Sequence, residues 1–368
     1  MSKFTVFILC LFLMFPVHLS YAAQPLHKDV QMKSELALRK LKAHLERGDK
    51  VAPIVEKMQR VKTLGQKGKL HKANLLLDVI LQDFVALEQQ NKQRLDAALF
   101  VNDKPVQIVG YNSDVMEPFI TRDGKYMFFN DFQSKAHKKD MFYATRMDDY
   151  HFKYKGPVKN INTSEVEGVP SMDDDGNFYY ISTDKYKMKN LVTAYVGRFV
   201  KGKIVNIRPL PELSKNVPGW LNMDLEISAD GQTLYSTQSH FKGDSFPDAS
   251  YFFYAKKVGD KFVPQKDSAH IFKELNKDPI IYAAALSRDE LEIMYTRLTI
   301  HKGQHRFDTL RATRPAKDQP FGTPVVMPNI TGFSEAPAMT DDGKIVYYHK
   351  KDVTGKKLFQ LHALHRKQ

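Results

Sequence analysis

The amino-acid sequence is poor in cysteine: among its 368 residues the only one is Cys10. This scarcity excludes a disulfide framework, a cysteine-rich zinc site and a cysteine nucleophile beyond the first residues. The sequence also lacks a phosphate-binding Gly-rich loop, a dinucleotide-binding fingerprint and a Gly-x-Ser-x-Gly nucleophile elbow. Several large classes of nucleotide-dependent enzymes and serine hydrolases are thereby disfavoured, and we expect no cofactor.

Long apolar runs are also absent after the first residues. The apolar run from Phe4 to Val17 follows Lys3 and is followed by Ser20, Tyr21 and Ala22, which is the pattern of a secretory signal peptide over residues 1–22. No later stretch approaches the ~20 apolar residues that a membrane span requires. We therefore expect an exported protein, periplasmic or secreted, without a membrane span.

Charge of one sign is in excess. The chain has 55 Lys and Arg residues against 42 Asp and Glu, a formal net charge of +13. A basic balance favours anionic partners, and export makes nucleic acid the least plausible of them. The expected partners are an envelope protein or an anionic glycan, with no nucleic acid.

Residues 23–100 have a helical pattern. Apolar residues recur at spacings of three and four from Lys33 to about Leu99, and the stretch from Gly65 to Lys69 interrupts them. The piece from Val51 to Phe84 resembles a tetratricopeptide-type helical hairpin. Because one hairpin cannot bury both of its faces, we expect it to dock on the following domain or to associate with a second copy.

After residue 100 the pattern changes to short strands separated by Asp-Gly turns. One template occurs five times, and its glycine falls at positions 124, 176, 231 and 343, with Glu290 replacing it in the fourth copy. The intervals are 52, 55, 59 and 53 residues, and each unit holds about four strands. Residues 101–368 are therefore predicted to form a mainly β, five-bladed β-propeller.

The ends of this region predict how the propeller closes. The last unit stops after its third strand, while an unassigned strand from Pro105 to Val109 precedes the first unit. We expect Pro105–Val109 to complete the last blade as a strap that joins the two ends and removes free sheet edges.

The repeat carries a family resemblance. A Pro, Ser or Thr and Asp-Gly-Lys precede alternating aromatic and aliphatic residues, followed by Asp140-Met141-Phe142-Tyr143-Ala144 and Gly156-Pro157-Val158. Over residues 100–368 this pattern resembles the WD-like propeller repeat of TolB-like periplasmic proteins. The resemblance implies the fold, whereas propellers of this kind serve as scaffolds and as enzymes.

In such a propeller, the loops that enter the innermost strands open on the face that ligands generally use. Those loops supply acidic and aromatic side chains, and the loops between the second and third strands supply basic ones. The predicted ligand-binding residues of the channel face are Glu117, Glu167, Trp220, Asp224, Tyr282 and Glu335. The predicted basic rim around them consists of Lys138, Lys139, Lys302 and Lys350.

The favoured function is a binding scaffold that recognises an envelope protein or anionic glycan through this face, with no residue assigned to catalysis. The alternative is a carbohydrate-active enzyme. As a glycoside hydrolase it would use channel carboxylates from the set Glu117, Glu167, Asp224 and Glu335. As a metal-dependent polysaccharide lyase it would use the loop histidines His137, His240, His301 and His349.

Clustered aspartates raise a further possibility, a calcium site at Asp173-Asp174-Asp175-Gly176 or at Asp341-Asp342-Gly343. Asp-Gly is also the ordinary choice for a hairpin turn that needs positive φ, and the spacing lacks the distal glutamate of an EF-hand. We therefore interpret these residues as turns and predict no metal site.

Overall fold

The computed structural model describes residues 24–132, 138–187, 190–243, 246–352 and 358–367. The segment predicted to be a signal peptide lies outside these ranges. The chain divides into two compact units, Met1–Lys92 and Gln93–Gln368. Within the described part of the chain, no helix has both the length and the apolar character needed to cross a membrane.

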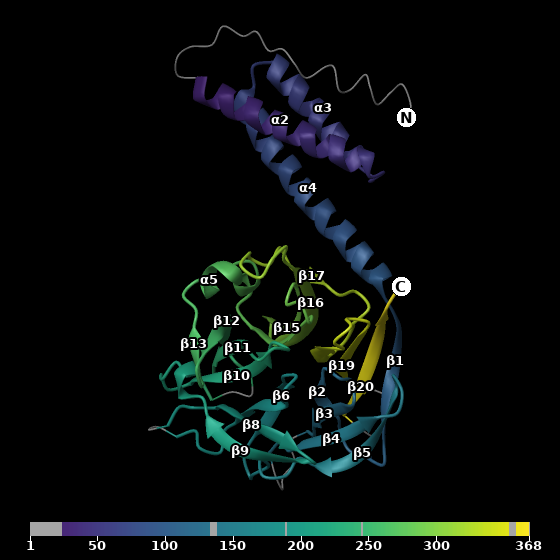
Figure 1. Cartoon of the computed structure of the whole chain (residues 1–368). Coiled ribbons are helices and arrows are strands. Elements are labelled where there is room, and N and C mark those ends of the chain that lie inside the picture. Colours follow the sequence, from purple (N-terminus) through teal and green to yellow (C-terminus); the bar gives the residue numbers. More distant parts are fainter. Residues whose placement is uncertain (1–23, 133–137, 188–189, 244–245, 353–357, 368) are drawn as a thin grey trace. The chain divides into compact units, whose positions relative to one another are not determined.

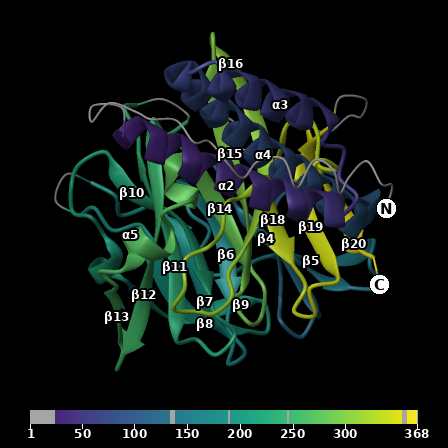
Figure 2. The ribbon, with the colours of Figure 1, turned by 90° about the horizontal axis from the view of Figure 1, so that it is seen from above.

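The first unit is built from three helices: α2 (Gln24–Glu46), α3 (Ala52–Gln66) and the first part of α4 (Leu70–Leu99). Their apolar stripes meet in one core that includes Leu41, Met58, Ile80 and Phe84. Ion pairs join the helices, among them Lys33 with Asp78 at 2.8 Å. Helix α2 packs on the hairpin of α3 and α4 and buries a face for which the sequence indicated no partner within this region (Figure 2).

The second unit consists of antiparallel sheets arranged around a central axis (Figure 1). Its described strands form four-stranded groups, three of them as separate sheets and two joined in one eight-stranded sheet. The strands, in group order, are β2 (Met116–Ile120), β3 (Tyr126–Asn130), β4 (Met141–Arg146) and β5 (His151–Pro157); β6 (Glu167–Met172), β7 (Asn177–Ser182), β8 (Ala194–Val200) and β9 (Lys203–Pro209); β10 (Trp220–Ile227), β11 (Thr233–His240), β12 (Ala249–Val258) and β13 (Lys261–Pro264); β14 (Ile281–Leu286), β15 (Glu292–His301), β16 (Gln304–Thr313) and β17 (Val325–Val326); and β18 (Ser334–Met339), β19 (Ile345–Lys351), β20 (Phe359–Arg366) and β1 (Phe100–Val109).

Short helical segments lie between the third and fourth groups and before β10. They are the helix α5 (Ser268–Ile271) and the single 3₁₀ turns η2 (Pro211–Leu213) and η3 (Leu275–Lys277). The first strands of the groups contact one another in the order β2, β6, β10, β14 and β18, and β18 contacts β2. This closed ring of inner strands is the arrangement of a β-propeller.

The predicted strap is β1, and it is longer than the sequence suggested. Its first part pairs antiparallel with β20, and its last residues, Gln107 to Val109, pair parallel with β5. The strands β18, β19 and β20 lie side by side at the C-terminal end of the chain (Figure 2). One strand near the start of the second unit therefore pairs with both the last group and the first, which leaves no open sheet edge between them.

Hydrophobic layers fill the spaces between neighbouring groups, and the two-residue period of a strand explains their composition. Phe128 on β3 points toward the second group and packs near Phe178, whereas its neighbour Phe129 points toward the fifth group and packs in the layer that contains Tyr347. Both faces of the second strand in each group are buried. This is why the repeat reads as a continuous apolar run rather than as alternating residues.

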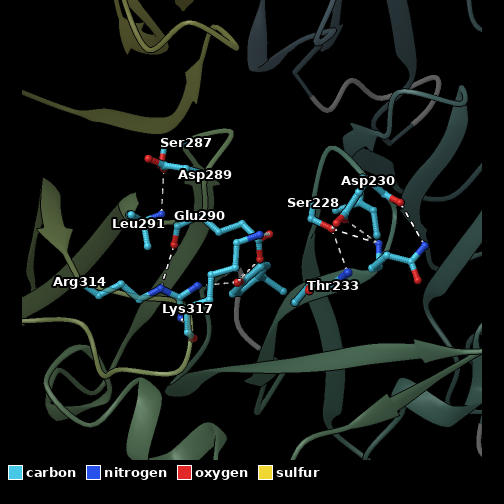
Figure 3. A network of polar contacts seen from close by, with 12 residues as sticks. Ser228, Asp230, Thr233, Ser287, Asp289, Glu290, Leu291, Arg314 and Lys317 are labelled. Carbon is cyan, nitrogen blue, oxygen red and sulfur yellow. Dashed lines mark hydrogen bonds and ion pairs between the residues drawn. The ribbon is translucent and has the colours of Figure 1, made fainter.

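The Asp-Gly segments are turns, as predicted. Gly124, Gly176, Gly231 and Gly343 all have φ between +67° and +80°. The side chains before them close the turns: the Ser228 hydroxyl donates to Asp230 at 2.6 Å, and the Ser287 hydroxyl donates to Asp289 at 2.6 Å (Figure 3). Asp173 accepts backbone N–H groups of Asp175 and Asn177 within its own turn, so the turn uses the oxygen atoms that a calcium site would need.

The turn of the fourth group has Glu290 where the other groups have glycine. Glu290 takes the left-handed conformation at φ 59° and its side chain is buried. Its carboxylate accepts the Tyr235 hydroxyl at 2.6 Å and pairs with Lys317, and its carbonyl accepts Arg314 Nε at 2.8 Å (Figure 3). The strain of a non-glycine residue in this region is offset by a polar network that ties the third group to the fourth.

We predict that Val106→Asp destabilises the second unit by more than about 3 kcal/mol, because it buries an unpaired charge between the first and last groups. Val109→Asp is the matched control: it lies on the same strand and is 38% exposed, so its effect should stay within about 0.5 kcal/mol. Thermal unfolding followed by near-ultraviolet circular dichroism measures both. Equal melting temperatures for the two variants would contradict the role of β1 as the closing strand.

We also predict that Glu290→Gly lowers the free energy of unfolding by about 2 kcal/mol, although it restores the glycine of the other repeats. The Tyr235 hydroxyl and Lys317 lose their carboxylate partner, and this loss exceeds the relief of backbone strain. Glu290→Gln keeps the hydrogen bonding without the charge. Its free energy of unfolding, measured by chemical denaturation, should lie between those of the wild type and Glu290→Gly. A variant with glycine that is as stable as the wild type would show that the network contributes nothing net.

Candidate functional site

The face at which the inner strands begin, which we call the mouth face, has an unusual backbone. The register between the first and second strand shifts by a bulge in every group. At the bulge, Glu117, Val169, Ala283 and Ala336 have positive φ values between +47° and +54°. Bulges of this kind re-aim side chains, and non-glycine residues hold this conformation only where the surroundings enforce it.

The bulge releases backbone N–H groups from the sheet, and side chains of the preceding group accept them. The Ala283 N–H donates to Asp224 Oδ2 at 2.8 Å, and the Ala336 N–H donates to Thr296 Oγ1 at 3.1 Å. The Glu117 N–H donates to His349 Nδ1 at 3.2 Å. Polar side chains at the mouth are therefore needed as hydrogen-bond acceptors for buried backbone N–H groups. The same side chains are also available for chemistry.

Three carboxylates and their partners form one connected group there. Glu117 forms an ion pair with Lys139, Glu335 accepts the Tyr282 hydroxyl, and His349 Nε2 lies 3.1 Å from Glu335 Oε2. We call these residues the mouth cluster: Glu117, Lys139, Asp224, Tyr282, Glu335 and His349. The repeat places Glu117 and Asp224 at equivalent positions, four residues before Thr121 and Ser228, and Tyr282 and Glu335 at equivalent positions one residue earlier in the template.

The environment displaces the pKa values of two carboxyl groups in opposite directions. Burial raises the pKa of Asp224 to about 7, and the nearby negative charge of Glu117 adds to the increase. Burial also acts to raise the pKa of Glu117, but the adjacent Lys139 ammonium outweighs it and holds that pKa below its ordinary value. At neutral pH the cluster therefore contains one carboxyl group that is partly protonated and another that is ionised.

Lys139 and Tyr282 respond to the same charges. Burial acts against the charged form of Lys139, but the negative charge of Glu117 prevails and raises the pKa of the ammonium group. The pKa of the Tyr282 hydroxyl is raised well above its ordinary value by burial, with the Glu335 charge as a further cause. Lys139 thus stays a cation and Tyr282 stays a hydrogen-bond donor at any physiological pH.

Beneath the mouth cluster the axis holds a small cavity of about 30 Å³, lined by Glu117, Glu226 and short side chains at the bulges, including Ala283, Ala284 and Ala336. A water molecule needs about 10–15 Å³ of such space, so this cavity has room for one or two. Further along the axis Glu226 accepts hydrogen bonds from Ser171 at 2.8 Å and Arg122 at 3.0 Å.

Two of the predicted channel-face residues lie outside the mouth cluster. Glu167 is fully buried and accepts hydrogen bonds from the Thr163 backbone N–H at 2.9 Å and the Ser182 hydroxyl at 2.8 Å, so its oxygen atoms hold its own group together. Trp220 lies in a different cluster, where the Lys215 ammonium is 3.2 Å from the centre of its ring and Tyr251 packs beside it. Only Glu117, Asp224, Tyr282 and Glu335 come together.

The four lysines of the predicted basic rim have different surroundings. Lys139 is half-buried in the mouth cluster rather than on a rim. Lys138 pairs with Glu165, and Lys350 lies 3.8 Å from Asp103. Lys302 is exposed. Because three of the four face carboxylates, their charge is partly compensated before any anionic ligand arrives.

The histidines considered for metal binding separate in the same way. His240 Nδ1 lies 2.6 Å from Asp248 Oδ1, while His349 belongs to the mouth cluster. His137 lies outside the described residues, and of His301 only the backbone is described. Among the described residues, no group of three or more His, Asp or Glu side chains is arranged to hold a metal ion.

Comparison with known proteins finds remote structural likenesses. No family model and no curated protein matches the chain. Similar solved structures include a thermostable family-43 glycoside hydrolase, with 11% identity, a TM-score of 0.45 and coverage of 72% of this chain and 92% of that one. The catalytic domain of a Coprinopsis cinerea GH62 α-L-arabinofuranosidase has 12% identity, a TM-score of 0.44 and coverage of 73% and 96%.

A putative TolB from Agrobacterium tumefaciens also matches, with 12% identity, a TM-score of 0.38 and coverage of 66% of this chain and 72% of that one. The ring of inner strands, and not these likenesses, identifies the second unit as a β-propeller. The TolB-like structure is one of several propellers among the similar structures, and none of them assigns a function to this chain.

We predict that Asp224→Asn makes the protein more stable than the wild type at high pH but not at low pH. A carboxyl group whose pKa is raised from 3.8 to about 7 on folding lowers the free energy of unfolding as the pH rises through that window, by at most about 4 kcal/mol. The difference in melting temperature, variant minus wild type, should therefore grow between pH 4 and pH 8. Asp175→Asn, at an exposed turn on the opposite face, is the control. A difference that is constant with pH would contradict the proposed state of Asp224.

Proposed function

We propose that the chain is an exported five-bladed β-propeller that hydrolyses glycosidic bonds at its mouth cluster. The observation that carries this proposal is the opposite displacement of the Asp224 and Glu117 pKa values at one site. Glycoside hydrolases need a protonated carboxylic acid and an ionised carboxylate on either side of the bond that breaks. The mouth cluster therefore favours a glycoside hydrolase over a binding scaffold, because none of the described contacts specifically supports a scaffold.

The ring of inner strands supports a count of five blades. Strands β2, β6, β10, β14 and β18 each begin one four-stranded group, and β1 supplies the fourth strand of the last group. Glu117 comes from the first group, Asp224 from the third and Glu335 from the fifth. Their convergence on one axis is what a closed ring of wedge-shaped sheets produces, because the start of every inner strand faces the axis.

The roles follow from the protonation states. Asp224, protonated up to about pH 7, is the proton donor to the oxygen atom of the leaving sugar. Glu117, ionised and paired with Lys139, is the carboxylate that either activates water or stabilises the positive charge that develops on the sugar ring. The cavity beside Glu117 provides space for a water molecule.

Glu335, Tyr282 and His349 are positioning residues. Tyr282 and His349 both hydrogen-bond to Glu335, and His349 also accepts the bulged N–H of Glu117. The network links the backbone that carries Glu117 to the carboxylate of Glu335 through one imidazole ring. A fixed hydrogen-bonded frame of this kind keeps catalytic groups in place without reorganisation during the reaction.

The test uses the purified chain from residue 24 with arabinan, xylan and polygalacturonate, and detects new reducing ends by chromatography. We predict turnover of one class, a rate that falls above about pH 7 as Asp224 loses its proton, and losses of about 10²–10⁴-fold in Asp224→Asn and Glu117→Gln. Glu165→Gln, a partly exposed carboxylate on the same face, should retain activity.

Two results would contradict the proposal. The first is turnover that Asp224→Asn and Glu117→Gln leave unchanged, which would place the chemistry elsewhere. The second is binding of a polysaccharide without release of any product, which would favour the binding scaffold.

A further inference from the structure

A groove of about 680 Å³ opens on the mouth face between the start of β16 and the segment that leads into β18. Its volume lies in the range of sites that hold small molecules or a few sugar units. The groove is lined by aromatic, basic and small residues: His305, Arg306, Phe307, Asp308, Val326, Met327, Pro328, Ile330, Thr331, Gly332 and Phe333.

Two aromatic rings, Phe307 and Phe333, line the groove, and the rings of Phe246 and Phe359 pack against them. Phe307 and Phe333 have ring centres 3.9 Å apart, Phe246 lies 5.9 Å from Phe307, and Phe359 lies 5.3 Å from Phe333. Phe246 and Phe333 are half-buried, so parts of their rings are open to solvent. Successive rings along a groove present apolar surface at several points to an extended ligand.

The groove adjoins the mouth cluster through buried side chains. Phe307 belongs to the same hydrophobic cluster as Tyr282, Ala283 and Ala336, and Phe333 packs against that cluster. Tyr282 in turn donates to Glu335, and the Ala283 N–H donates to Asp224. The groove and the mouth cluster are therefore linked by contiguous packing and hydrogen bonds.

Arg306 gives the groove its charge preference. Asp308 is buried and shared by two guanidinium groups: Arg297 donates to one of its oxygens at 2.8 Å and Arg306 Nε donates to the other at 3.0 Å. The side chain of Arg306 is 72% exposed, and among the described residues its two terminal nitrogens have no partner. A guanidinium group held at Nε with its outer nitrogens free is oriented to bind a carboxylate with two hydrogen bonds.

We propose that this groove binds a polysaccharide that contains uronic acids, with sugar rings packed on Phe333 and Phe246 and a uronate carboxylate bound by Arg306. That the polysaccharide is a substrate rests on the proposed function, whereas the binding of the polysaccharide does not. The exposed Lys302 and His305 beside Arg306 add to the attraction of an anionic chain. A neutral glycan would lack an anionic partner for the outer nitrogens of Arg306.

The experiment measures binding of polygalacturonate to the full chain by titration calorimetry, with neutral arabinan as the comparison. It is carried out in Asp224→Asn, so that turnover does not remove the ligand. Arg306→Gln, added to that background, should weaken polygalacturonate binding at least fivefold and reduce its salt dependence. The thermal melt should stay close to that of the parent, because Arg297 still pairs with the buried Asp308.

The matched control is Lys344→Gln, which removes an exposed positive charge, also paired with an aspartate, from the opposite face and should not alter binding. Phe333→Ala should weaken binding of polygalacturonate, with Phe246→Ala as the second test in case Phe333→Ala loses its fold. Equal affinities for polygalacturonate in Arg306→Gln and its parent, tighter binding of arabinan, or no binding at all would overturn the inference. Binding that depends on Arg306 in a wild-type protein that releases no sugar would leave the inference standing and contradict the proposed function alone.

Discussion

The bulge at the start of each inner strand is the constraint on which the mouth face depends. A ring of inner strands brings their first residues close to one axis, and the bulge there takes backbone N–H groups out of the sheet. Buried N–H groups need acceptors, and these come from the preceding group: Asp224, Thr296 and His349. Polar side chains at the axis are thus required by the fold before any function is considered.

The fold does not require the particular charges that occupy those positions. At the position four residues before the turn Ser or Thr, the template has Glu117 and Asp224 in two groups but Ala283 and Ala336 in two others. Carboxylates at only some of the equivalent positions create an asymmetric site from a repetitive frame. Lys139 stabilises the charge of one carboxylate and leaves the other to be raised in pKa by burial, so one axis holds two different protonation states.

Repetition in the sequence was sufficient to predict the strands, the turns with positive φ and the closing strap, because each of these depends on short-range periodicity. The structure brings four of the predicted residues, Glu117, Asp224, Tyr282 and Glu335, together on one face. It places Lys139 against Glu117 of the same group, because the direction of a loop side chain depends on the carboxylate that it meets after folding. Glu167 and Trp220 were grouped with the site for the same reason: an entering loop has residues that face the axis and others that face their own sheet.

The amino-acid sequence by itself determined that five similar units follow a helical region and that carboxylates recur where these units begin. Only the tertiary structure decided which of those carboxylates meet. Glu117 with His349 and Tyr282 with Glu335 join different groups of the ring, across 232 and 53 residues of sequence. Glu117 with Lys139 and His349 with Glu335 each lie within one group. No local pattern encodes such pairs, because they arise from closure of the ring and from burial, which fixes the protonation state of each group only after the chain has folded.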